Sequence, residues 1–256
     1  MATQSDGPKT AEPESSGPDW YFTRSKRPLE ILVFLAPFII AYEIGLLGVL
    51  QSGNGSVLTN LAHKTIIDLF QSLGVTVAGL ALPGLVLVVL LLVWQVLRRE
   101  PWRIHPPTIG CMWLESALYV LPLLLMAQLL TGVHEFSQVA PAQGQQPETG
   151  LLARIAVGIG AGLYEELIFR WLLIAVIHTI ACDIFNVGNR MGLVFAIGIS
   201  ALAFMYYHPL EGAPTGRLVF YFLGGVFFGV LFVARGFGIV AATHAMYDIV
   251  VVLGDQ

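Results

Sequence analysis

The chain alternates long apolar runs with short polar segments, a pattern that predicts membrane-spanning helices. A helix needs roughly 17–25 mostly apolar residues to cross the hydrocarbon layer. Seven stretches approach or reach this length: Leu29–Leu50, Thr76–Leu97, Ile109–Thr131, Leu151–Ile180, Met191–His208, Arg217–Ala234 and Gly238–Leu253. Polar side chains interrupt an eighth stretch, Val57–Leu73, which favours an interfacial or re-entrant amphipathic helix. If that stretch also crosses, the number of spans becomes eight.

Composition supports this interpretation. Hydrophobic residues make up 56% of the 256 residues and charged residues only 12%, whereas soluble domains carry about 25% charged residues. We therefore predict an all-α, polytopic transmembrane bundle of seven to eight helices, with the lipid bilayer as its surroundings. The formal net charge of −4 is small and indicates no nucleic-acid partner.

The chain divides into three regions. Residues 1–28 form a tail whose first part is rich in Ser, Pro, Glu and Gly, a composition typical of disorder, and which ends in an aromatic and basic collar at the membrane surface. Residues 29–148 carry the N-terminal transmembrane helices. Residues 149–256 form a C-terminal helical region that contains the candidate chemistry.

The distribution of basic residues predicts the orientation of the bundle. If Val57–Leu73 does not cross, the loops on the same side as the N-terminus contain eight basic residues. The loops and span edges on the other side contain three. Cytoplasmic loops carry the excess of Lys and Arg. We therefore expect an integral protein of the cell membrane with a cytoplasmic N-terminus.

Three ionisable residues lie deep inside one apolar stretch. Glu165, Glu166 and Arg170 fall near the middle of Leu151–Ile180, where each charge costs ~2.5–3.5 kcal/mol on insertion scales. Glu166 and Arg170 are four residues apart and share a helix face, whereas Glu165 points elsewhere. We interpret Glu166 and Arg170 as a buried structural pair and Glu165 as a candidate general base. Arg170 could also orient both carboxylates.

Two later spans each contribute a histidine. His208 shares a helix face with Phe204, and His244 shares one with Asp248, close enough for the carboxylate to accept a hydrogen bond or to line the same cavity. Carboxylates and imidazoles together can activate water, bind a divalent metal, or do both. In a simple up-and-down bundle, however, the two histidines would lie at opposite faces, so one shared site requires tilted, staggered or broken spans.

Small residues favour close helix contacts around this set. Gly158 and Gly162 precede the acidic pair, and Gly225 and Gly229 precede the last span, each pair at the four-residue spacing that lets helix backbones approach.

These motifs, in this order, resemble the CPBP family of intramembrane proteases, which includes the type II CAAX prenyl endopeptidases and bacteriocin-processing or immunity relatives. The family pattern is Glu-Glu-x-x-x-Arg, then Phe-x-x-x-His, then His-x-x-x-Asn or a similar polar residue. Here the three motifs are Glu165-Glu166-Leu-Ile-Phe-Arg170, Phe204-Met-Tyr-Tyr-His208 and His244-Ala-Met-Tyr-Asp248. The resemblance covers about Leu151–Leu253.

The resemblance implies an endopeptidase acting on a peptide or protein substrate, which is lipid-modified for the prenyl endopeptidases. It implies that Glu165 activates water with the help of His208, while His244 and Asp248 stabilise the oxyanion or position the water. The family is labelled metalloprotease, and a metal-free glutamate mechanism has also been argued for it. In this chain one divalent metal such as zinc could be held by Glu165, His208, His244 and Asp248. Asp248 departs from the usual Asn, and this difference favours a cation.

Two other functions fit the same residues. The first is a membrane binding or immunity-type protein that keeps the cavity but cleaves nothing. The second is a cation or proton transporter that uses Glu165, His208, His244 and Asp248 as a relay. An inverted repeat would support transport, and none is evident in the sequence.

Overall fold

The computed structural model describes residues 19–48, 82–132, 151–208 and 212–254, and every regular element in these ranges is helical. The elements are α1 (Asp19–Arg24), α2 (Pro28–Gly48), α4 (Leu82–Arg98), α5 (Pro106–Thr131), α6 (Leu151–Glu166), η2 (Leu167–Leu173), α7 (Ile174–Thr179), η3 (Ile180–Ile184), α8 (Asn189–Tyr207), α9 (Thr215–Arg235) and α10 (Phe237–Gly254). The predicted all-α polytopic bundle is confirmed. The predictions for Val57–Leu73 and for residues 1–18 lie outside the described residues.

Six of the described helices are long and apolar enough to cross a membrane. They span Pro28–Gly45, Pro106–Thr131, Leu151–Ile184, Asn189–Tyr207, Thr215–Arg235 and Phe237–Gly254. The described part of the predicted Thr76–Leu97 span is the shorter apolar helix Gly84–Arg98. The protein is therefore an integral membrane protein.

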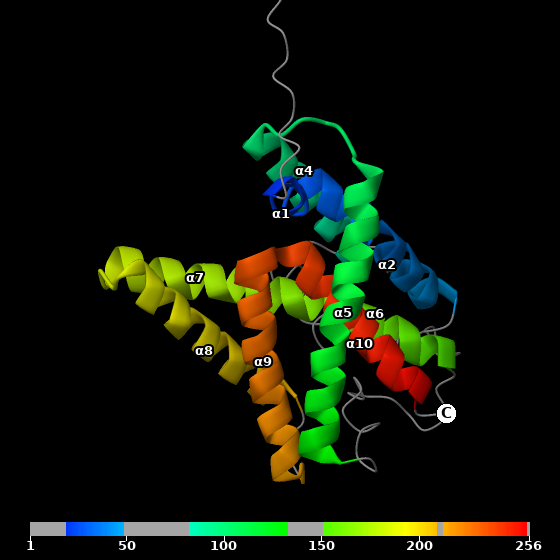
Figure 1. The fold of residues 1–256 in the computed structure, drawn as a ribbon, viewed down its shortest axis with the longest axis vertical. Coiled ribbons are helices and arrows are strands. Elements are labelled where there is room, and N and C mark those ends of the chain that lie inside the picture. Colours follow the sequence, from blue (N-terminus) through cyan, green and yellow to red (C-terminus); the bar gives the residue numbers. More distant parts are fainter. Residues whose placement is uncertain (1–18, 49–81, 133–150, 209–211, 255–256) are drawn as a thin grey trace, which may run out of the picture.

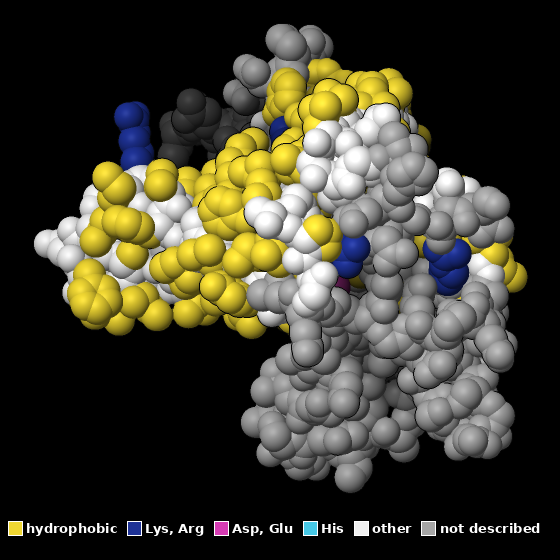
Figure 2. Space-filling view, turned by 90° about the horizontal axis from the view of Figure 1, so that it is seen from below, with side chains coloured by type: hydrophobic (Ala, Val, Ile, Leu, Met, Phe, Trp, Pro, Cys, Tyr) yellow, Lys and Arg dark blue, Asp and Glu magenta, His cyan; other side chains and the backbone are white. Residues whose placement is uncertain are grey.

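The fourth predicted span is longer than expected. Elements α6, η2, α7 and η3 follow one another from Leu151 to Ile184 over 34 residues, or about 50 Å at 1.5 Å per residue. The prediction ended this span at Ile180. Its second half and α8 form an arm that projects from the bundle at the left of Figure 1. Exposed apolar side chains cover this arm, as Figure 2 shows, which suits a surface facing lipid.

Helix α10 lies at the centre of the bundle and packs along α6. A side-chain carbon at Gly162 of α6 would lie 2.7 Å from Ala245 Cα of α10. Gly225 of α9 faces Ala201 of α8 in the same way, at 2.9 Å. Glycine at these positions therefore permits the close helix contacts that the sequence predicted.

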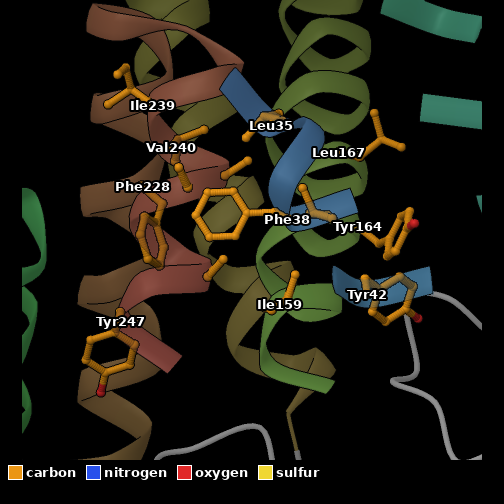
Figure 3. Close-up of a cluster of buried hydrophobic side chains, with 14 of the residues drawn as sticks. Leu35, Phe38, Tyr42, Ile159, Tyr164, Leu167, Phe228, Ile239, Val240 and Tyr247 are labelled. Carbon is orange, nitrogen blue, oxygen red and sulfur yellow. The ribbon is translucent and has the colours of Figure 1, made fainter. Parts of the chain in front are cut away.

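One hydrophobic cluster joins helices from both the N-terminal and the C-terminal regions. Figure 3 shows Leu35, Phe38 and Tyr42 of α2 beside Tyr164 of α6, and the cluster continues through Val240 of α10. Each of these side chains is buried. The N-terminal helices thus support the C-terminal region directly.

A polar cluster ties α1 to the end of the bundle where α9 stops and α10 begins. Arg235 follows the predicted span Arg217–Ala234, but it is the last residue of α9 and is buried. Its Nη2 lies 2.8 Å from Glu115 Oε2 of α5, and Tyr21 of α1 donates a hydrogen bond to the same carboxylate. Glu115 therefore neutralises Arg235 and holds α1 in place.

Candidate active site

The motif residues from three helices meet at one small cavity of about 20 Å³ inside the bundle. Glu165, His208, His244 and Asp248 all line it. This volume is sufficient for a water molecule. The structure therefore brings together the four residues that the sequence proposed as one site.

Unequal helix lengths explain how His208 reaches Glu165. The α6–η3 segment has 34 residues and α8 has 19, so α8 returns only as far as the middle of the longer segment, where Glu165 lies. The helix ends at Tyr207, and His208 takes an extended backbone conformation (φ −83°, ψ 154°), as expected for a residue before proline. His208 is thereby placed inside the bundle.

The acidic pair divides as the sequence predicted. Glu166 Oε1 lies 3.1 Å from Arg170 Nη1, and neither side chain has solvent exposure. The Arg170 guanidinium also lies over the rings of Phe204 and Phe228, at 4.1 and 5.2 Å from their centroids. The cation is thus held by one carboxylate and two aromatic faces.

Glu165 lies apart from this pair and faces His208. Its Oε2 is 4.0 Å from His208 Nε2, and the side chain is almost fully buried. This separation is too long for a direct hydrogen bond and is compatible with a bridging water. Residues Leu167–Leu173 form a π-helical segment directly after the acidic pair, and such segments occur frequently at functional sites.

Two contacts orient the His208 ring. Its Nδ1 lies 2.8 Å from the Phe204 carbonyl oxygen, and because a carbonyl only accepts, Nδ1 carries the proton. When the ring is neutral, the lone pair is therefore on Nε2, the atom that faces Glu165 and the cavity. The ring of Tyr221 in α9 stacks on the His208 ring, with the two centroids 4.1 Å apart.

His244 contacts both remaining carboxylates. Its Nδ1 lies 2.7 Å from Glu166 Oε1, and its Nε2 lies 3.6 Å from Asp248 Oδ2. The acceptor of the His244 hydrogen bond is therefore Glu166, while Asp248 lines the cavity. Glu166 binds a site histidine in addition to Arg170, a contact that the sequence did not predict because it depends on how α10 packs on α6.

Aromatic residues complete the cavity. Tyr221 and Phe228 of α9 and Tyr247 of α10 line it, and Phe228 stacks on His244 at 4.7 Å between centroids. We did not identify these residues from the sequence. The signal available was the spacing of aromatic residues and glycine along α9, which resembles ordinary helix packing.

The carboxylate and imidazole groups at the cavity are donor types that divalent cations bind. Among the described residues, no group of three or more His, Cys, Asp or Glu side chains is arranged to hold a metal ion. The Nε2 atoms of His208 and His244 instead face separate carboxylates.

The fold and the cavity define a helical membrane protein with a buried carboxylate–histidine site. Residues 147–250 match the family described as type II CAAX prenyl endopeptidase Rce1-like. This match confirms the resemblance predicted from the three motifs and includes every motif residue. No curated protein and no solved structure matches the chain.

Proposed function

We propose that the protein is an intramembrane endopeptidase in which Glu165 and His208 activate a water molecule. The observation that carries this proposal is the 4.0 Å gap between Glu165 Oε2 and His208 Nε2 at a cavity with room for water. A carboxylate in such a position can accept a proton from the bridging water. The Rce1-like family match supports peptide-bond hydrolysis as the reaction.

In the proposed reaction, Glu165 takes one proton from water while the water oxygen attacks the carbonyl carbon of the scissile amide. His208 positions this water through Nε2. The tetrahedral intermediate then collapses as the carbon–nitrogen bond breaks, and the proton held by Glu165 passes to the leaving nitrogen. One water is consumed and a new carboxyl and a new amine are formed.

We assign stabilisation of the developing oxyanion to His244, at the Asp248 side of the cavity. When His244 carries both ring protons, Nε2 can donate to the oxyanion while Nδ1 remains bound to Glu166. The nearby carboxylates of Glu166 and Asp248 would stabilise the imidazolium. Glu166 and Arg170 would act through His244 rather than on the substrate itself.

The proposed steps use only side chains and water, and metal chelation tests this route. Full cleavage after exhaustive chelation would support the proposed route. Cleavage that is lost on chelation and restored by zinc would contradict it.

The activity test uses purified protein in proteoliposomes and fluorogenic peptides that carry or lack a C-terminal prenyl group. The prenylated peptide is the preferred substrate expected from the family description. Glu165→Gln and His208→Ala should each lower kcat by about 10²–10⁴-fold, the usual contribution of a general acid–base group. Full activity in both variants would refute the assignment.

Matched controls use the same substitutions away from the cavity. Glu43→Gln changes a glutamate of α2 that accepts a hydrogen bond from the Gly84 amide. His178→Ala changes a histidine of α7 that contacts Asn189. Both controls should keep activity.

The same assay separates the two alternative functions. A protein that binds the peptides without cleaving them would be an immunity-type or binding protein. Ion flux that depends on Glu165 and is unaffected by peptide would identify a transporter.

We also propose, from the basic residues of the loops, that the N-terminus is cytoplasmic.

A further inference from the structure

A second cavity, separate from the catalytic one, is lined in part by α1 and α4, the helices in the upper part of Figure 1. Its volume is about 570 Å³, within the range of small-molecule sites. It lies between the α1–α2 junction, the last turns of α4, η2, the end of α9 and the start of α10. It shares no described lining residue with the catalytic cavity.

One side of this cavity is cationic. Lys26 and Arg98 line it, and no acidic side chain is among its described lining residues. In the described part of the chain, Arg98 pairs at the surface with Glu100, at 3.6 Å with its own side chain 54% exposed, and such pairs contribute little. Within the described parts of the chain, Lys26 has no ion-pair partner. Among the described residues, the charge of Lys26 therefore has no carboxylate partner, and that of Arg98 has a weak one.

The surroundings of Lys26 disfavour its positive charge. Burial and the nearby Arg235 guanidinium lower the pKa of the Lys26 ammonium. The carboxylate closest to Arg235, Glu115, is already engaged by Arg235 and Tyr21. A bound anion would supply a counter-charge and stabilise the positive charge of Lys26.

The other side of the cavity is aromatic. Trp94 of α4, Trp171 of η2 and Phe237 of α10 form a continuous row, with successive ring centroids 5.2 Å apart. Phe22 and Phe232 extend this apolar lining. A small soluble anion would leave these rings unused, whereas a molecule with an anionic head and an apolar chain would contact both sides.

We propose that this cavity binds one anionic phospholipid, with its phosphate at Lys26 and Arg98 and the upper part of an acyl chain along Trp94, Trp171 and Phe237. Basic pockets between transmembrane helices are suited to anionic lipid head groups. Helix α1, which contributes Phe22 and Thr23 to the cavity, carries aromatic and basic residues of the kind enriched at membrane surfaces. This inference does not depend on the proposed protease activity.

The test uses full-length protein in phosphatidylcholine nanodiscs and bromine-labelled phosphatidylglycerol, because bromine quenches tryptophan fluorescence at short range. Trp94 and Trp171 are the reporters. We expect saturable quenching by the anionic lipid, weak quenching by bromine-labelled phosphatidylcholine, and loss of the saturable part in W94F/W171F. Equal quenching by both lipids would overturn the proposal.

The charge requirement is tested with K26Q/R98Q. Its apparent affinity for the anionic lipid should fall at least about tenfold, since each basic residue near a lipid surface adds roughly a fivefold factor. The matched control R99Q/R103Q removes two exposed positive charges at the same end of the molecule, outside the cavity, and should bind nearly as wild type. Equal losses in both double variants would refute a specific site.

Inorganic phosphate at millimolar concentration distinguishes the two sources of a phosphate group. Quenching that persists in its presence supports a lipid ligand. Quenching that free phosphate abolishes would assign the cavity to a soluble anion and overturn the lipid proposal. Melting of each variant in detergent, followed by circular dichroism, verifies that the compared proteins are folded.

Discussion

Replacing Arg170 by methionine provides a sharp test of the buried charges at the site. Glu166 and Arg170 are both fully buried at 3.1 Å, and Arg170 also lies 4.1 Å above the Phe204 ring. Removing one partner of a buried ion pair costs about 3–5 kcal/mol, because the other charge stays buried and unpaired. A desolvated cation–π contact adds about 2 kcal/mol. We expect Arg170→Met to destabilise the protein by about 5–7 kcal/mol.

The double variant Glu166→Gln/Arg170→Met should recover much of this loss. It leaves no unpaired charge, and the glutamine oxygen can still accept the hydrogen bond from His244 Nδ1. Only the cation–π contribution of about 2 kcal/mol should remain lost. The double variant should thus be more stable than Arg170→Met by about 3 kcal/mol or more.

The measurement is reversible unfolding in mixed detergent micelles, followed by circular dichroism, for the wild type, both single variants and the double variant. Glu166→Gln alone should cost about 3–5 kcal/mol, since Arg170 then lacks its carboxylate. A double variant as unstable as Arg170→Met, or less stable, would refute the reasoning. In that case Arg170 would stabilise the bundle by shape and aromatic contacts alone.

Two further predictions follow from the packing around the site. Tyr221→Phe should retain activity, because the ring that stacks on His208 is preserved. Tyr221→Ala should lower kcat at least about tenfold with little change in KM. Equal kinetics in the two variants would exclude a positioning role for Tyr221. Gly162→Ala should destabilise the bundle, because its new carbon would lie 2.7 Å from Ala245 Cα. Gly198→Ala is the matched control: it meets nothing within 4 Å and should be neutral or stabilise by up to about 1 kcal/mol in thermal unfolding.

Much of the helix pattern could be predicted because hydrocarbon thickness sets a minimum apolar length. The contact between Glu166 and Arg170 was also predictable, since a four-residue spacing fixes two side chains on one helix face. Both features depend on local sequence alone.

The relation between Glu165 and His208 could not be derived in the same way. It depends on the difference in length between α8 and the α6–η3 segment and on the π-helical segment after Glu166. The hydrogen bond from His244 to Glu166 likewise depends on the rotation of α10 against α6. These are long-range packing properties. The membrane-spanning helices are apolar on nearly all faces, so their sequences carry little information about how each helix is rotated about its axis.

The position of the charges explains why such a site can exist inside a membrane. Arg170 is paired with Glu166 rather than with Glu165. If Arg170 were paired with Glu165, that carboxylate would be fixed by an ion pair and less able to accept a proton from water. Placing the ion pair one residue later neutralises one charge, leaves Glu165 facing His208, and gives His244 a fixed acceptor. The order Glu-Glu-x-x-x-Arg therefore separates, within one helical turn, a carboxylate held in an ion pair from the one to which we assign the general-base role.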